Sequence, residues 1–273
     1  AICPKCAVRF GQGEPLTAPD RVRLIELPLN ARMEDVVGGI NERIAIEQQR
    51  IRLERGILAQ ADQNILYVDE VNLLDDQIVN AILDAAAQGR YVVRRGPLRL
   101  TYRARLTLVG SMNPEEGKLR PQIMDRFGLR LVVRGGKESD QRLEIYHRAR
   151  AYAENPHAMS GQWTEETALL AEEVARAREL LPHVVLDASA ARYGLQLVDQ
   201  LRISSHRAEY TLLEAARAHA AADGRSTASL PDVTAIAPMA LRLRRSAFIE
   251  NFIREQDQED QEISEALQRS QNG

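Results

Sequence analysis

The feature that most constrains the fold is a short apolar run that ends in two acidic residues. Residues 65–68 read Ile-Leu-Tyr-Val, and Asp69 and Glu70 follow at once. A continuous apolar run of this length is typical of a central strand in a parallel sheet that is covered on both faces. We therefore predict a buried strand over residues 65–68, with two carboxylates at its carboxyl end.

The surrounding sequence predicts alternating strands and helices. Three further apolar stretches are expected to form strands: residues 22–29, 106–110 and 129–133. A helix capped by Asp75 and ended by Gly89 is expected because apolar residues recur there at helical spacing. Residues 91–102 read as a β-hairpin, and residues 41–60 read as a partly exposed helix or an insertion.

The order of these elements predicts two domains and a tail. Strands interleaved with helices indicate an α/β sheet domain, which we expect over residues 1–136. Residues 137–249 predict helices alone, with starts near Thr164, Asp187, Ser204 or Ser205, and Ser229. Residues 250–273 are rich in Gln and Glu and read as a solvated acidic tail or a fraying helix.

Composition and charge exclude several classes of protein. Hydrophobic residues make up 44% and charged residues 27% of the chain, which is ordinary for a globular protein. The net charge of -3 lacks the overall positive charge that is typical of nucleic-acid-binding proteins, although it does not exclude a local basic patch. No apolar run approaches the ~20 residues that cross a bilayer, so we expect no membrane span. With no leader sequence and only Cys3 and Cys6, we expect a cytoplasmic protein.

The acidic pair is the first candidate for chemistry. In open α/β sheets, ligands bind beyond the carboxyl ends of the strands. Adjacent strand residues point to opposite faces, so Asp69 and Glu70 can do different work. One carboxylate can hold a hydrated Mg²⁺ and the other can orient or deprotonate a water, as in a Walker B motif. An acidic loop without function is the competing interpretation.

Three more residues are candidates for the same chemistry: Asn113, Arg126 and Arg207. Asn113 follows the predicted strand 106–110, where a neutral amide can orient a water, although an Asn-Pro turn is the alternative. Arg126 can bring positive charge to a phosphoryl group on a neighbouring subunit, and an ion pair of Asp125 within the chain is the alternative. Arg207 lies in the opening turn of a predicted helix. A cation at that position is unfavourable because it opposes the helix dipole, and a nearby anion such as phosphate would make the position favourable. Because the chain is rich in arginine, chance placement is the competing interpretation of Arg207.

Taken together, residues 65–74, 109–117 and 119–128 resemble the I subunit of magnesium chelatase, an AAA+ ATPase of the helix-2-insert clade. The resemblance extends from about Leu24 to about Arg245. It assigns roles residue by residue: Asp69 as the Walker B aspartate on Mg²⁺, Glu70 as the catalytic glutamate, Asn113 as sensor 1, Arg126 as the arginine finger on the next subunit's ATP, and Arg207 as the sensor 2 arginine of the lid.

This resemblance implies a fold, cofactors and partners. The fold is a partial AAA+ P-loop NTPase core with a parallel sheet, followed by a C-terminal all-α lid. The implied cofactors are ATP and Mg²⁺, and the implied assembly is a homo-oligomeric ring, usually a hexamer. A D-type subunit with an integrin-like domain and a porphyrin-binding H-type subunit are the implied partners. Hydrolysis of ATP in such a complex drives insertion of Mg²⁺ into protoporphyrin IX.

One departure from the family is the missing P-loop, G-x-x-x-x-G-K-[ST]. The only Gly-Lys pairs are Gly117-Lys118 and Gly136-Lys137, and neither is followed by Ser or Thr. That loop cradles the phosphates, so we expect the chain as given to bind ATP poorly and to be inactive alone. We interpret the loss as truncation before the loop. Two alternatives stay open: an AAA+ ATPase with another client, such as cobalt chelation or remodelling of a von Willebrand-type partner, and a non-hydrolysing ring scaffold.

Overall fold

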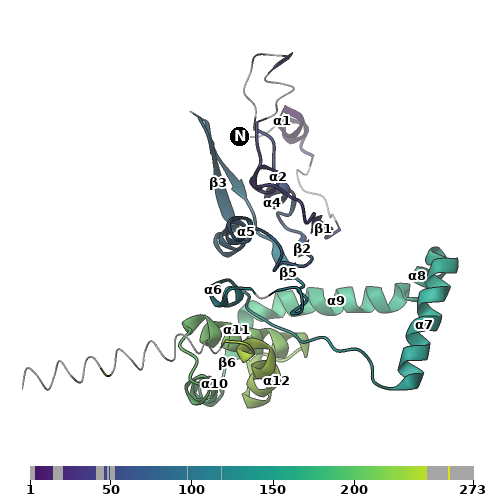
Figure 1. Cartoon of the computed structure of the whole chain (residues 1–273), viewed down its shortest axis with the longest axis vertical. Coiled ribbons are helices and arrows are strands. Elements are labelled where there is room, and N and C mark those ends of the chain that lie inside the picture. Colours follow the sequence, from purple (N-terminus) through teal and green to yellow (C-terminus); the bar gives the residue numbers. More distant parts are fainter. Residues whose placement is uncertain are drawn as a thin grey trace, which may run out of the picture. The chain divides into compact units, whose positions relative to one another are not determined.

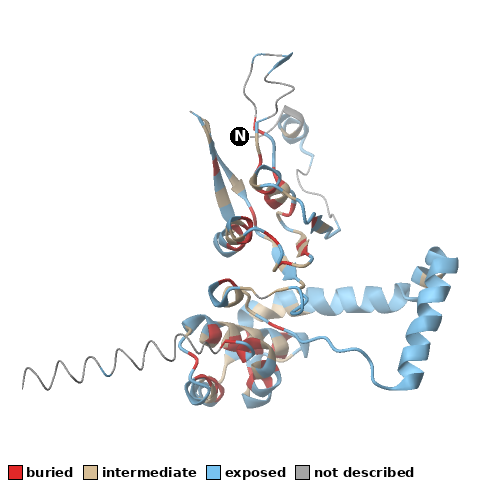
Figure 2. Ribbon diagram, viewed as in Figure 1, coloured by how far each residue is buried: buried red, intermediate tan, exposed pale blue. Residues whose placement is uncertain are grey.

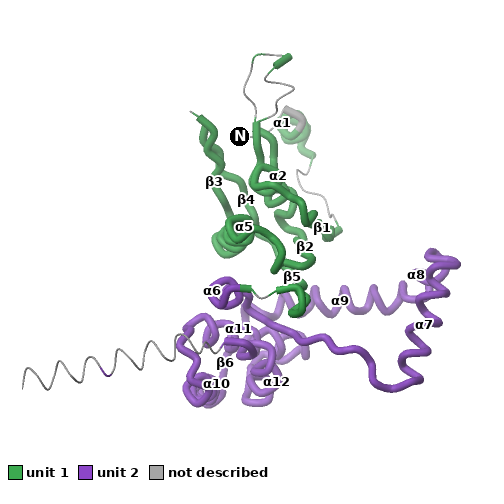
Figure 3. The backbone as a smooth tube through the Cα atoms, viewed as in Figure 1, with its two compact units in different colours: residues 1–119 green, residues 120–273 purple. Residues whose placement is uncertain are grey.

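The computed structural model describes residues 4–14, 21–40, 46–47, 49, 53–96, 98–117, 119–244 and 258. The chain divides into two compact units, residues 1–119 and 120–273 (Figure 3). The segment 120–136 belongs to the second unit, where the backbone N–H of Arg130 donates to the carbonyl oxygen of Met239 at 2.9 Å. The predicted domain boundary at residue 136 stays a prediction.

The first unit is built on a three-stranded parallel sheet (Figure 1). Its strands are β1 (Leu24–Leu27), β2 (Ile65–Val68) and β5 (Thr107–Gly110), in the order β1-β2-β5. The central strand β2 pairs in parallel with both neighbours, and its Leu66 and Val68 side chains are buried. The predicted buried strand over residues 65–68 is therefore confirmed.

Short helices and a hairpin complete the first unit. The helices are α1 (Pro4–Gly11), α2 (Met33–Val37), α4 (Ile57–Gln60) and α5 (Asp76–Gln88). The side chain of Asp75 caps α5 by accepting from the backbone N–H of Gln77, and Gly89 ends the helix with a φ of 65°. Both were predicted, because Asp accepts such bonds and Gly adopts positive φ without strain. The antiparallel strands β3 (Arg90–Arg95) and β4 (Leu98–Arg103) form the predicted hairpin.

Between residues 120 and 244, the regular structure of the second unit is helical apart from two very short strands. Its helices are α6 (Pro121–Met124), α7 (Ser139–Glu154), α8 (Pro156–Gln162), α9 (Thr164–Leu180), α10 (Ala188–Gln200), α11 (His206–Ala222) and α12 (Leu230–Leu241). The parallel strands β6 (Val185–Leu186) and β7 (Thr227–Ala228) are an addition to the helices-only prediction. The predicted starts of α9, α10, α11 and α12 are confirmed to within two residues.

The core of the second unit lies between α10, α11 and α12. Val198, Leu212 and Val233 are almost fully buried there. Figure 2 shows buried segments, in red, gathered on these three helices. In contrast, α7, α8 and α9 contain no buried residue, and α9 joins a smaller cluster only near its end, through Ala177 and Leu180. Among the described residues, no helix has the length and apolar character needed to cross a bilayer.

The predicted strand over residues 129–133 is wrong. This segment forms no regular structure, and Leu131, Val132 and Val133 are exposed. A strand needs a neighbour to satisfy its backbone groups. Here the backbone N–H of Arg130 bonds to a carbonyl oxygen of α12 instead. Apolar composition alone therefore predicted a strand, but this segment pairs with no strand among the described residues.

The predicted helix over residues 41–60 is only partly testable, because residues 41–45, 48 and 50–52 lie outside the described ones. Its described portion is not one helix. Leu53 forms an antiparallel bridge with Ile40, and helical geometry returns only in α4. Gly56 precedes α4 in an extended conformation, where a β-carbon would lie 2.3 Å from the carbonyl oxygen of Val36. The close approach of two backbone segments therefore interrupts the helix.

Candidate functional site

Two segments leave neighbouring strands of the sheet and meet at one edge. Because β2 and β5 are parallel, with Val68 opposite Gly110, the segments 69–70 and 111–113 leave the sheet side by side. The backbone N–H of Ser111 donates to the carbonyl oxygen of Val68 at 3.0 Å, which extends the pairing beyond the strands. The structure thus brings the predicted acidic pair and the segment of Asn113 to the same edge.

Asp69 is exposed and held as a carboxylate. The hydroxyl of Ser111 donates to its Oδ1, and the hydroxyl of Tyr67 donates to the same oxygen at 3.0 Å. These two bonds, that of Ser111 above all, lower the pKa of Asp69 because they favour the charged form. A carboxylate oxygen is a hard ligand of the kind that Mg²⁺ prefers. The donor set at this position therefore fits a hydrated Mg²⁺.

Glu70 differs from Asp69 in both backbone and charge. Its φ of 47° lies in the left-handed region, which non-glycine residues rarely adopt and where strained residues of active sites cluster. Its backbone N–H donates to Oγ of Ser111 at 3.2 Å. The negative charge of Glu116, followed by partial burial and the charge of Asp69, raises the pKa of Glu70. A raised pKa makes a carboxylate a better proton acceptor near neutral pH.

Asn113 stabilises the turn that follows β5. Its side-chain Oδ1 accepts from the backbone N–H of Glu115 at 3.2 Å, and its backbone oxygen accepts from Nδ2 of Asn72 at 3.4 Å. The turn that the sequence offered as an alternative is therefore present. The role of Asn113 in orienting a water stays a prediction.

Three residues of this edge were missed by sequence reasoning: Tyr67, Ser111 and Asn72. A signal existed for two of them, since Tyr67 lies two residues before Asp69 and so on the same face of the strand. Ser111 lies opposite Asp69 when the register of β2 and β5 is continued by one residue. Asn72 had no such signal, and its Oδ1 is buried without a hydrogen-bond partner among the described residues.

In the second unit, Arg126 and Arg207 line one pocket. The pocket has a volume of about 310 Å³ and is also lined by Asp125, Tyr210 and Thr211. Arg126 comes from the turn after α6, and Arg207 comes from the first turn of α11. Arginine is the residue type whose planar fork binds an anion such as phosphate, and two arginines line this one small volume. The sequence predicted each cation separately, and the structure brings them together.

Asp125 and Arg244 hold the loop that carries Arg126. The Asp125 carboxylate accepts from Oγ of Ser205 at 2.9 Å and from Nη1 of Arg244 at 2.6 Å, and it lies 3.8 Å from Nη1 of Arg207. The Arg244 side chain is fully buried and also donates to the carbonyl oxygen of Gly128 at 2.9 Å. The ion pair of Asp125 offered as an alternative is therefore present, and Arg126 nevertheless lines the pocket.

A second buried arginine supports the same loop. Arg130 donates from Nη2 to the carbonyl oxygen of Met124 at 2.6 Å and from Nη1 to that of Arg242 at 2.9 Å. Burial, followed by the charge of Arg244, lowers the pKa of Arg130 to about 10, so it stays a cation at neutral pH. Nothing in the sequence distinguished Arg130 or Arg244 from the many other arginines.

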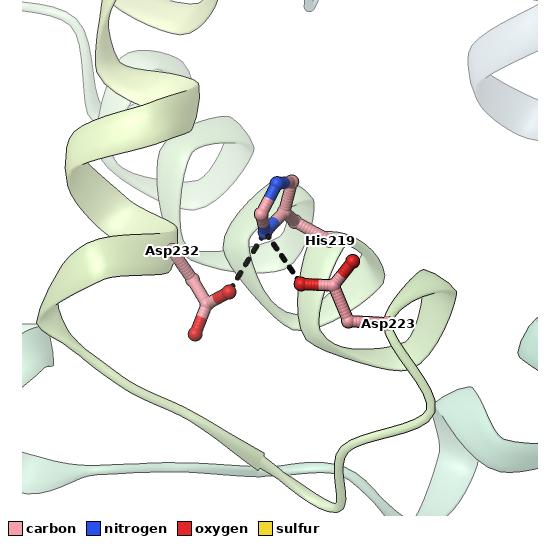
Figure 4. A group of neighbouring side chains, drawn as sticks. All are labelled: His219, Asp223 and Asp232. Atoms are coloured by element: carbon pink, nitrogen blue, oxygen red, sulfur yellow. Dashed lines mark hydrogen bonds and ion pairs between the residues drawn. The ribbon is translucent and has the colours of Figure 1, made fainter.

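A third polar cluster joins the end of α11 to the start of α12 (Figure 4). Nδ1 of His219 lies 2.7 Å from the buried Asp232 and 4.0 Å from Asp223. Donors so close together could hold a metal ion, but Arg225 already donates to both oxygens of Asp232. That guanidinium, above all other causes, keeps the pKa of Asp232 well below its usual range. The cluster therefore stabilises the helical unit.

Family models match two parts of the chain. A model of the MCM P-loop domain matches residues 41–146, and a model of the AAA lid domain matches residues 197–266. The crystal structure of a protein assigned as an ATPase from Cytophaga hutchinsonii superposes with a TM-score of 0.58 at 18% identity, covering 81% of this chain and 68% of that one. At this identity the match shows the fold alone.

Curated relatives are considerably more similar in sequence. A magnesium-chelatase subunit ChlI homolog from Methanocaldococcus jannaschii is 39% identical over 249 residues, which cover 90% of this chain and 68% of the relative. A magnesium-chelatase 38 kDa subunit from Acidiphilium rubrum is 38% identical over 254 residues, covering 92% of this chain and 74% of that protein.

Proposed function

Since this chain belongs to the magnesium-chelatase subunit I family of AAA+ ATPases, we propose that it is part of an ATPase motor that hydrolyses MgATP in a ring of copies. The proposal rests chiefly on one observation. Asp69 and Glu70 meet the segment of Asn113 at the carboxyl edge of a parallel sheet. That edge is where α/β sheets bind their ligands.

The carboxylates have separate tasks in this proposal. Asp69, ionised and bonded to the hydroxyls of Ser111 and Tyr67, binds Mg²⁺. Glu70, with its raised pKa, accepts a proton from the attacking water. Asn113 orients that water through its amide. Bound MgATP would supply the phosphoanhydride bond that is broken and the metal charge that neutralises the phosphates.

The two arginines of the second unit supply positive charge. Arg126 and Arg207 line the same pocket, so we propose that they act together on one phosphate group, with Arg126 as the finger that serves the next copy of the ring. Their guanidinium groups stabilise charge that develops on the transferred phosphoryl group. Asp125 and Arg244 position both by holding the loop.

The phosphate-binding loop lies outside these 273 residues in this proposal. No G-x-x-x-x-G-K-[ST] occurs in them, and we place that loop in sequence upstream of Ala1 of the complete protein. The chain alone is then expected to hydrolyse little ATP. The proposed location is the cytoplasm.

The client proposed for the motor is a magnesium chelatase. The names of the relatives, which are magnesium-chelatase subunits, support it. In this proposal the hydrolysis of ATP serves a D-type subunit with an integrin-like domain and a porphyrin-binding H-type subunit. These would insert Mg²⁺ into protoporphyrin IX. The client is tested by adding the two partner subunits and following metal insertion by porphyrin fluorescence. Active ATPase without metal insertion would assign the motor to another client.

The ATPase itself is tested with Glu70→Gln in the complete protein. The variant should keep nucleotide binding but lose hydrolysis by roughly 10²–10⁴-fold, the usual contribution of a general base. Glu165→Gln, which makes the same change on the exposed first turn of α9, is the matched control and should retain full turnover. Unchanged turnover in Glu70→Gln would reject the assignment. A complete protein without a P-loop would favour a non-hydrolysing scaffold.

A further inference from the structure

The β3–β4 hairpin of the first unit concentrates arginines that the proposed ATPase does not use. Residues 90–105 contain six arginines and no acidic residue: Arg90, Arg94, Arg95, Arg99, Arg103 and Arg105. This local charge of +6 stands against a net charge of -3 for the whole chain. The hairpin is therefore a strongly basic element on a weakly acidic protein.

The strand register arranges four of these arginines as two pairs. Arg90 lies directly opposite Arg103, and Arg94 lies directly opposite Arg99, on the two strands labelled β3 and β4 in Figure 3. Residues that pair directly point to the same side of a hairpin, and so do residues two or four apart on one strand. All four side chains therefore share one face, which we call the arginine face, and all four residues are exposed.

An uncharged pair lies between the two arginine pairs. It consists of Val92 opposite Thr101, and both are exposed, with 44% of Val92 accessible to solvent. Along the strands the arginine face is thus basic, uncharged and basic again. Residues four apart on a strand are separated by about 13 Å, at about 3.3 Å per residue, which gives the distance from one arginine pair to the other.

The opposite face of the hairpin accounts for its packing within the first unit. Val93 is buried there, and the rings of Tyr91 and Tyr102 lie 5.6 Å apart, centroid to centroid. On the same side, Arg95 forms an ion pair with Glu34 at 3.6 Å, and β3 contacts α5. The arginine face is thus not needed for the hairpin to pack.

The arrangement of the arginine face weakens the hairpin. Like charges directly opposite each other destabilise a β-pair. Within the described part of the chain, the four arginines make one ion pair, between Arg103 and Asp62 at 3.5 Å. Two opposed pairs of cations with so little neutralisation indicate a surface that is complementary to an anionic partner.

We propose that the arginine face binds an extended acidic segment of a partner protein, in which two acidic residues four positions apart flank a central apolar residue. In an extended segment alternate side chains point to one side, so the two acids and the apolar residue all face the hairpin. The two acids are separated by about 13 Å, as the two arginine pairs are. Each carboxylate lies between two guanidinium groups, and the apolar side chain covers Val92.

The chemistry of the face favours carboxylates in this arrangement. The planar fork of arginine bonds both oxygens of a carboxylate, and two such forks flank each of the two positions. The exposed Val92 between the charged pairs gains from an apolar neighbour, because its remaining accessible surface is removed from water. The face therefore selects for the spacing of the acids and for the residue between them.

Nucleic acid fits this face less well. Binding of single strands uses aromatic rings on which bases stack, and the arginine face contains none, because Tyr91 and Tyr102 lie on the opposite face. The net charge of -3 disfavours the approach of a long polyanion. A short acidic segment interacts mainly with charges within a Debye length of about 8–10 Å, and these are the arginines of the face.

The test measures how peptides protect the arginine face of the full chain from phenylglyoxal, read residue by residue by mass spectrometry. The probe is the blocked peptide Gly-Glu-Thr-Val-Thr-Glu-Gly. Its permuted form, Gly-Glu-Glu-Val-Thr-Thr-Gly, has the same composition and charge but cannot reach both arginine pairs. We expect half-protection at a roughly fivefold lower concentration of the probe, as one exposed carboxylate contact distinguishes the two peptides.

Two arginines of the second unit are internal controls. Arg148 and Arg150 form ion pairs with Glu144 and Glu154 on α7. Their modification by phenylglyoxal should be the same with the probe as with the permuted peptide.

Variants locate the binding on the hairpin. Arg94→Gln with Arg99→Gln removes one arginine pair and should abolish the difference between the peptides, read at Arg90 and Arg103. The matched control, Arg148→Gln with Arg150→Gln, should preserve it. The hairpin variant also removes an opposition of like charges, so its melting temperature should not fall, which separates loss of binding from loss of folding.

A third variant tests the centre of the face. Val92→Gln replaces the exposed apolar side chain and keeps all four arginines. The natural chain should prefer the probe over the same peptide with Gln at its centre, and the variant should lose this preference.

Equal protection by the probe and its permuted form would overturn the proposal, because the face would then attract negative charge without selecting a spacing. Stronger protection by a 20-residue oligonucleotide than by the probe, at the same molar concentration and 0.15 M salt, would also overturn it and assign the face to nucleic acid. None of these readouts uses ATP hydrolysis, so the outcomes are independent of the proposed motor activity.

Discussion

Two pairs of site residues are positioned by different means. One pair is Asp69 and Glu70 of the first unit, and the other is Arg126 and Arg207 of the second. The acids follow directly from a strand, so backbone pairing of β2 with β5 sets their place. The arginines come from segments distant in the sequence, and the buried Arg244 together with Asp125 holds them around one pocket. The carboxylate of the exposed Asp69 can be replaced at little cost in stability, whereas Arg244, which supports the arginines, cannot, because its side chain is fully buried.

The largest expected effect is on ATP hydrolysis and concerns Arg126 of the second unit. Arg126→Ala in the complete protein should lower ATP hydrolysis by roughly 10³–10⁵-fold, the contribution of an arginine finger, while nucleotide binding is retained. Turnover and nucleotide affinity are measured separately. Arg148→Ala on α7 is the control for loss of an exposed arginine.

Mixing two inactive variants sharpens this prediction. If Arg126 serves the next copy, Arg126→Ala and Glu70→Gln proteins should regain part of their activity when mixed. In such a ring, the finger of a Glu70→Gln copy meets the intact carboxylates of an Arg126→Ala copy. No recovery in rings shown to be mixed would place the finger and the carboxylates of one site on the same copy.

The next effect is on stability and tests the comparison itself. Arg244→Met should lower the free energy of unfolding by about 3 kcal/mol, because it removes a buried partner of Asp125 and of the loop carbonyl oxygens. Asp69→Asn, at an exposed position, should change it far less. Urea unfolding of both variants measures the difference. Equal losses would show that the two sites are not held differently.

A smaller effect should appear on acidification of the second unit. The pKa of Asp232 is lowered by Arg225, so its contribution to stability is present above the unfolded value of about 4 and is lost as the pH falls below it. We expect Asp232→Asn to cost about 2 kcal/mol at pH 7 and less at pH 3. Thermal unfolding between these pH values measures it. A constant difference would contradict the assignment.

The smallest effect concerns the proton affinity of Glu70. The charge of Glu116 is the main cause of its raised pKa, so Glu116→Gln should lower that pKa. If Glu70 accepts a proton in hydrolysis, the acid limb of the pH–activity profile should then move to lower pH, with little change in rate at neutral pH. An unchanged pH–activity profile would show that the charge of Glu116 does not raise the pKa of Glu70.

Local pattern predicted much of the fold. The AAA+ core with its parallel sheet, the helical lid and membership of the chelatase family are confirmed. The run 65–68 and the caps Asp75 and Gly89 were recognisable because each residue acts on its own backbone or its nearest neighbours. Residues 129–133 were assigned wrongly because strand formation depends on a partner elsewhere in the chain.

The amino-acid sequence by itself determined which charges the protein carries and where locally marked elements lie, such as the strand 65–68 and the capped helix 76–88, since periodicity and capping are local properties. Only the tertiary structure decided that Ser111 and Tyr67 share one oxygen of Asp69, that Arg126 and Arg207 line one pocket, and that Arg90, Arg94, Arg99 and Arg103 form one face. Each of these depends on register or packing between distant segments, which is set by the whole fold.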